Sequence, residues 1–236
     1  MPRNRTRPAS TLQGTKRVTA IVPDKRLPGN LVVEINETRF ASLPVDLVTS
    51  FRIVTDRELS DDLYEKLLHA ADVEAAYLVA VRMLAARPRA VNELLRRLRD
   101  RGHNPAAAAR AVGRLETRGV LDDAEFSRHF TRTRLARSHG PPRILTDLLA
   151  RGVDRRVAER AIDEVVDQEE FDGLKEARTV TEKRLAQLGD LPPDRLTRRL
   201  LAYLARLGYR GWEMRELVGQ LIRERGSETG DGSWPS

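Results

Sequence analysis

Three similar stretches of sequence decide the fold: Leu98-Arg-Asp-Arg-Gly102, Leu148-Leu-Ala-Arg-Gly152 and Leu204-Ala-Arg-Leu-Gly208. In each stretch a leucine stands four residues before a glycine, the residue that most cheaply adopts the left-handed conformation in which many helices end. Apolar residues recur ten and thirteen positions after each glycine, at Val112 and Leu115, Ile162 and Val165, and Val218 and Leu221. The repetition predicts tandem helical modules, spaced by 50 and 56 residues.

Helical periodicity begins at Ser60, which we predict to be an N-cap because acidic residues follow it in the first turn. Pro88 interrupts a first helix, and the pair Asn104-Pro105 opens a third, so that the first module contains three helices. The expected fold is mainly α, with three tandem three-helix repeats in an elongated array. Its expected parts are residues 60–121 as a linking helix with repeat 1, 122–168 as repeat 2, 169–225 as repeat 3 and 226–236 as a flexible tail.

The N-terminal quarter has a different character. Residues 1–15 are rich in Arg, Pro, Ser and Thr and predict a disordered basic arm. Residues 16–59 predict a small antiparallel β extension of two or three strands, because Arg17–Val22 and Leu31–Ile35 are rich in β-branched residues and are separated by turn residues. Arg52–Val54 is a candidate for one further strand. The apolar spacing of Val45, Val48 and Phe51 after Pro44 predicts a short helix.

The formal net charge of +7 is concentrated in the middle of the 236 residues. Residues 1–81 are neutral, residues 82–160 carry 19 arginines against nine acids, and residues 161–236 carry a net charge of −3. No acid occurs between Glu125 and Asp147. A basic band in an otherwise balanced chain indicates an anionic partner, most often nucleic acid.

The band supplies the candidate contact residues. Two plainer interpretations stay open: 37 of the 42 basic residues are arginine, a bias that genome base composition alone can produce, and arginines on a helix often form only a solvated face. Arg132 follows Arg128 by one helical turn, so we expect this pair to share a face. The predicted partner-binding residues are Arg128, Arg132, Arg134, Arg137 and Arg143, with Arg96, Arg97 and Arg101 behind them.

No catalytic, cofactor or metal motif is recognisable in the chain. It has no cysteine, no phosphate-binding loop and no dinucleotide fingerprint, and its four histidines lack metal-ligand spacing. The acid pairs Asp61-Asp62, Asp122-Asp123 and Glu169-Glu170 are interpreted as helix caps or first-turn acids. Tyr203, Tyr209 and Trp212 are interpreted as a local aromatic core rather than a base-stacking surface. We therefore expect neither an enzyme nor a cofactor.

No apolar run approaches the ~20 residues that span a bilayer. The basic N-terminus is not followed by the apolar core of a secretory signal. The expectation is a soluble, cytoplasmic monomer without a membrane partner.

A longer match centres on Gly119-Val-Leu-Asp-Asp-Ala-Glu-Phe-Ser-Arg-His-Phe-Thr-Arg-Thr-Arg-Leu-Ala-Arg137, followed by Gly140-Pro-Pro-Arg-Ile-Leu145. These stretches closely resemble the signature of the RecX family, bacterial regulators of the recombinase RecA. The segments from Tyr77 to Gly102 and from Gly152 to Ile162 are similar to the family's first and second repeats, and Ile35-Asn-Glu-Thr-Arg-Phe40 stands where some members have a short hairpin.

The resemblance implies three tandem three-helix repeats that bind within the groove of the RecA filament on DNA. It implies inhibition by blocking filament extension or strand exchange, without catalysis. The proline-rich joint at 191–193 and the net negative charge of residues 161–236 depart from the family pattern. The alternatives are a helix-turn-helix protein that binds DNA directly, without RecA, and a scaffold whose arginines only confer solubility.

Overall fold

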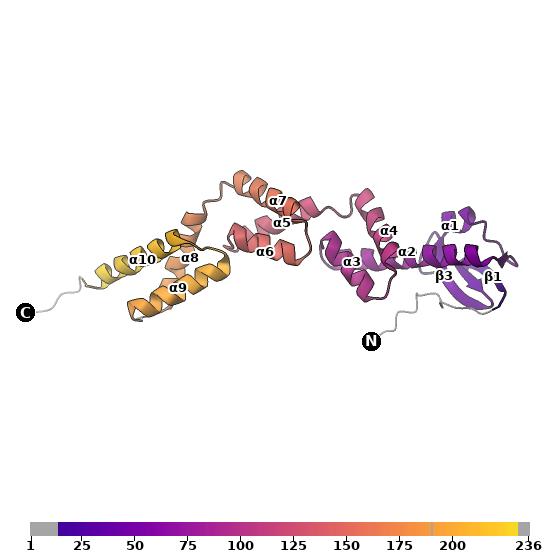
Figure 1. Ribbon diagram of the computed structural model, residues 1–236, viewed down its shortest axis with the longest axis horizontal. Helices are drawn as coiled ribbons and strands as arrows, with labels where there is room; N and C mark the ends of the chain where they lie inside the picture. The colour runs from indigo at the N-terminus through magenta and orange to yellow at the C-terminus, as the bar shows by residue number, and fades with distance from the viewer. Residues whose placement is uncertain (1–13, 190, 231–236) are drawn as a thin grey trace, which may run out of the picture. The chain divides into compact units, whose positions relative to one another are not determined.

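The computed structural model describes residues 14–189 and 191–230 (Figure 1). The chain divides into two compact units, one ending at Asp122 and the other beginning at Asp123. The predicted disordered arm falls mostly on residues 1–13, outside the described residues. The first unit holds a sheet and one helical module, and the second unit holds two modules. The expected fold class is confirmed: mainly helical, with an antiparallel sheet at the N-terminus.

The sheet has four antiparallel strands in the order β3-β2-β1-β4. Strands β1 (Lys16–Pro23), β2 (Asn30–Ile35) and β3 (Thr38–Pro44) form most of it, and β4 (Glu58–Leu59) pairs with the start of β1. The further strand predicted at Arg52–Val54 is therefore wrong. Arg52 has φ +51° and lies in a turn after the short helix α1 (Val45–Ser50), which follows Pro44 as expected.

Helix α2 (Asp61–Ala86) begins at the predicted cap, where the Ser60 hydroxyl accepts a hydrogen bond from the Leu63 amide at 3.3 Å. Its first half covers the sheet, because Tyr64, Leu67 and Ala71 pack into the same core as the strand residues. Its second half supplies Ala76 and Ala80 to the core of the first module. One uninterrupted helix thus belongs to two hydrophobic cores.

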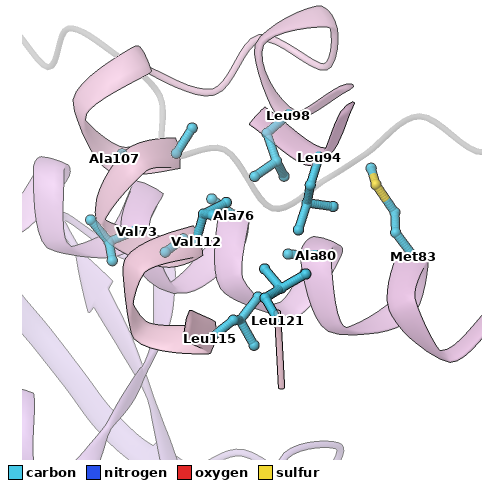
Figure 2. Packing of buried hydrophobic residues seen from close by; sticks show 12 residues of the cluster. Val73, Ala76, Ala80, Met83, Leu94, Leu98, Ala107, Val112, Leu115 and Leu121 are labelled. Atoms are coloured by element: carbon cyan, nitrogen blue, oxygen red, sulfur yellow. The ribbon is translucent and has the colours of Figure 1, made fainter. Parts of the chain in front are cut away.

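The first module consists of the second half of α2, α3 (Val91–Asp100) and α4 (Pro105–Thr117). Figure 2 shows Leu94 and Leu98 of α3 directed toward α2, with Val112 and Leu115 of α4 in the same cluster. Alanines on α2 and α4 are fully buried and let these two helices approach closely. Between α3 and α4, Gly102 has φ +85° and Asn104 caps α4, as predicted.

The second module is formed by α5 (Asp123–Leu135), α6 (Pro141–Ala150) and α7 (Arg155–Gln168). Helix α5 ends at Leu135, three residues before the end expected near Ser138. Gly152 has φ +85° and Asp154 caps α7. The interpretation of Glu169-Glu170 as first-turn acids is wrong, because both residues follow the C-terminus of α7 rather than precede a helix.

The third module consists of α8 (Gly173–Gln187), α9 (Pro193–Leu207) and α10 (Trp212–Gly230). Tyr209 is buried, but Trp212 is 71% exposed, so the interpretation of Trp212 as core is wrong. Helix α10 continues to Gly230, beyond Arg225, where the flexible tail is expected to begin. The rest of that expected tail, 231–236, lies outside the described residues.

Modules two and three meet where α9 ends and α6 begins. The amide of Gly140 donates to the carbonyl of Leu207 at 2.7 Å. Gly208 has φ +101°, and a Cβ placed on it would lie 2.6 Å from the Cβ of Arg143. A Cβ placed on Gly140 would lie 3.1 Å from Cε1 of the Tyr209 ring. Glycines at both positions therefore permit a close contact between the two modules within the second unit.

Candidate partner-binding surface

Small hydroxyl residues lie on the buried side of α5, the helix that carries three of the eight predicted arginines. Ser127 and Thr131 are fully buried, and each hydroxyl donates to the backbone carbonyl one turn earlier, at 2.6 and 2.8 Å. These bonds satisfy the hydroxyls internally, so α5 packs against α7 without a buried unpaired group. The long arginine side chains consequently lie on the flanks and outer face of α5.

Arg128 and Arg132 share one flank of α5, as their spacing predicts, and both reach α7. Arg128 donates to Glu125 at 3.0 Å and to Glu164 at 3.3 Å, and the bond to Glu125 is the main reason that the pKa of this guanidinium is raised. Arg132 donates to the side-chain oxygen of Gln168 at 3.1 Å and lies 3.7 Å from the Glu169 carboxylate. This flank is therefore partly neutralised.

Arg134 and Arg143 converge on a single carboxylate, Asp147 of α6. The nitrogen-oxygen distances are 3.8 Å from Arg134 and 3.2 Å from Arg143, and Asp147 is mostly buried. Two arginines thus share one acid, and the group keeps a net positive charge.

An aromatic pair lies beside this group. The rings of Phe126 and Phe130 stack with their centroids 6.0 Å apart. The guanidinium groups of Arg134 and Arg151 lie 4.9 and 4.5 Å from the centroid of Phe130. Stacking on an aromatic face fixes an arginine while leaving its outward N–H donors available.

The band that is free of acids in the sequence is therefore not free of acids in the folded second unit. Helix α7 and Asp147 bring carboxylates to four of the five predicted arginines of the band. Arg137 differs: its side chain is exposed and forms no ion pair with any residue that the structure describes. His129 is exposed nearby on α5, and His139 contacts the carbonyl of Arg137 at 3.1 Å.

The other predicted arginines lie on α3 or, in the case of Arg101, at its C-terminal cap, in the first unit. Arg96 is exposed and has no ion pair within the described part of the chain. Arg97 donates to Glu93 at 2.9 Å, and Arg101 donates to the backbone carbonyl of Arg97 at 3.3 Å. The α3 and α5 groups thus occupy different units, and the structure brings arginines together within each group.

Glu93, which is not among the residues predicted for the site, organises the α3 group. It is buried and accepts hydrogen bonds through Oε1 from Arg87, Arg89 and Arg97. Burial raises the pKa of the Glu93 carboxyl, but the arginine bonds and charges outweigh burial and leave the pKa below its ordinary value. The four-residue spacing from Arg89 to Glu93 and from Glu93 to Arg97 is a signal that could have identified it.

Residues 14–189 and 191–230 contain no group of three or more His, Cys, Asp or Glu that could hold a metal ion. None of the helices in these ranges is long and apolar enough to cross a membrane.

Two family models match the chain. Residues 76–115 match the first three-helix domain of RecX, and residues 122–162 match the second three-helix domain of RecX. These ranges contain all eight predicted arginines.

Two curated relatives are each named Regulatory protein RecX. One, from Halorhodospira halophila, is 36% identical over 143 residues, which cover 60% of this chain and 85% of the relative. The other, from Amycolatopsis mediterranei, is 34% identical over 149 residues, which cover 62% of this chain and 83% of the relative.

The fold also resembles solved structures. A crystal structure of regulatory protein RecX superposes with a TM-score of 0.66 at 17% identity, covering 87% of this chain and 99% of the solved one. A crystal structure of RecX from Lactobacillus salivarius gives a TM-score of 0.54 at 18% identity and covers 66% of this chain and 99% of its own.

Proposed function

The chain belongs to the RecX family of regulatory proteins, and from this premise we propose that it is a non-enzymatic inhibitor of the recombinase RecA. It binds within the groove of the filament that RecA forms on DNA, and it blocks filament extension or strand exchange. We propose further that it acts in the cytoplasm as a monomer. The proposal keeps the module boundaries at 60–121, 122–168 and 169–225.

The observation that supports this proposal most directly is the set of arginines that remain available on both matched modules. Arg96 on α3 and Arg137, two residues after the end of α5, are exposed and lack ion pairs in the described chain. Arginine suits a filament groove, because its planar fork binds either a carboxylate of the protein or a phosphate of the DNA through two hydrogen bonds. Occupying such a groove requires shape and charge but no reactive group.

The first prediction is that the purified full-length chain suppresses the DNA-dependent ATP hydrolysis of RecA at substoichiometric concentrations. The double variant R96E/R137E weakens the suppression by about tenfold or more, because it reverses two charges that form no ion pair with any described residue. The control is R26E/R156E, which reverses in each unit one exposed arginine that has no ion pair within residues 14–189 and 191–230 and lies outside the predicted set. An ATPase titration measures all three proteins.

Unchanged ATPase activity over a tenfold excess of the wild-type chain would contradict the proposal. Equal loss in both double variants would favour general charge attraction over a defined surface. Sequence-selective binding to duplex DNA without RecA would instead favour a helix-turn-helix DNA-binding protein.

A further inference from the structure

The outward face of α9 in the third module carries a row of arginines. Leu196, Leu200 and Leu204 of α9 are buried against the other helices of the module. The opposite face is exposed at positions spaced by four, three and four residues, a regular row along one side of the helix. This row consists of Arg195, Arg199, Ala202 and Arg206, with Arg198 beside it.

These arginines lack acidic partners, in contrast to those of α5. None of the four forms an ion pair with a residue in the described ranges, and only Arg206 has an aromatic neighbour, 6.0 Å from the ring of Tyr203. The only acid in the α9 sequence is Asp194, in its first turn. The charged side chains along this row of α9 are therefore all positive.

Like charges one turn apart repel, so an unpaired row of this kind works against the folded state unless an anion neutralises it. On helices α7 and α8 of the same unit, Arg155, Arg160 and Arg178 are each paired with a glutamate one turn away. The contrast within one unit indicates that the α9 row meets a negative charge supplied from outside the chain.

The geometry favours a nucleic-acid backbone over an acidic protein surface. From Arg195 to Arg206 the row extends about 16 Å along the helix, a length that faces roughly five phosphates of one duplex strand. Ala202, in the middle of the row, has a short side chain that allows a backbone to approach. A row of arginines, which carry only positive charge and only hydrogen-bond donors, is complementary to a line of phosphates. Protein surfaces, in contrast, mix positive and negative charges.

We propose that α9 binds the phosphate backbone of DNA directly, through Arg195, Arg199 and Arg206, and without preference for base sequence. This inference rests on the proposed function and adds to it a DNA contact in the third module. That helix lies outside both ranges matched by the family models.

The test measures binding of fluorescently labelled single-stranded and duplex DNA by anisotropy, without RecA, at several salt concentrations. The full-length variant R195Q/R199Q/R206Q is expected to bind about tenfold or more weakly. The slope of log affinity against log salt on duplex DNA should fall by about 0.9 for each phosphate that the variant no longer neutralises, hence by roughly two to three in all. Circular dichroism melts verify that the variant is folded.

The control R17Q/R155Q/R178Q removes the same charge from arginines that already have acidic partners. It is expected to keep the wild-type slope. Equal losses in both variants, or unchanged binding in the α9 variant, would overturn the inference. Unchanged DNA binding with lost RecA inhibition would also overturn it, in favour of an acidic protein partner. DNA binding that depends on α9 in a chain that does not inhibit RecA would refute the proposed function alone.

Discussion

Glu93 lies buried at the start of α3, and three arginine side chains reach its Oε1 atom. Its other carboxylate oxygen, Oε2, is buried without a hydrogen-bond partner among the described residues. The carboxylate fixes Arg97 and holds the segment that joins α2 to α3. Adjacent Arg96 does not bind this carboxylate and remains exposed, so it is available to a partner.

At this scale we predict that Glu93→Gln lowers the free energy of unfolding at pH 7 by about 1–3 kcal/mol, because three arginines lose their common charge. The folded-state pKa of Glu93 is lowered, so its stabilisation is complete above the unfolded carboxyl value of about 4.3 and is lost as the pH falls through the lower, folded value. Urea unfolding between pH 7 and pH 3 should therefore show the difference between wild type and variant shrinking with acid. A difference that stays constant with pH would contradict this, and the exposed Glu116→Gln is the control.

At the scale of elements, the contact between α9 and α6 depends on Gly208. We predict that Gly208→Ala costs about 2–4 kcal/mol of unfolding free energy, because a Cβ adds a clash with Arg143 to the strain of a positive φ. Urea unfolding followed by circular dichroism measures the change.

The matched control is Gly211→Ala. Gly211 has φ +116°, but a Cβ there meets nothing within 4 Å, so this variant should cost only about 1 kcal/mol. If the two variants lost the same unfolding free energy, the close contact with α6 would not contribute to the destabilisation caused by Gly208→Ala.

The same elements show which features of the fold could be predicted from the sequence. Gly102, Gly152 and Gly208 were predictable as helix ends because the cause is local, a backbone angle that favours glycine. The shared flank of Arg128 and Arg132 was predictable from one helical turn. Their neutralisation by Glu164 and Glu169 was not, since these acids approach the two arginines only after folding. The same reason explains the missed strand β4, whose hydrogen-bond partner is β1.

At the scale of the whole molecule, the sheet and the first module share α2. We predict that Leu67→Ala, in the sheet core, destabilises the entire first unit by about 2–5 kcal/mol. Hydrogen exchange followed by mass spectrometry should therefore show lower protection in α4, and not only in the sheet and the first half of α2.

The control for that experiment is Leu200→Ala, a fully buried position in the second unit. It should leave the exchange of α4 unchanged. Loss of protection confined to the sheet after Leu67→Ala would show that the two cores of the first unit open independently.

The exposed indole of Trp212 determines what tryptophan fluorescence can report about this protein. Both tryptophans, Trp212 and Trp234, follow the last of the repeated glycines, so the sheet and the first two modules contain no tryptophan to report on them. Because Trp212 is already 71% exposed, its emission should shift little when the chain unfolds. It stands one short loop after α9, within reach of an external quencher, and so makes the third module a natural optical reporter of binding.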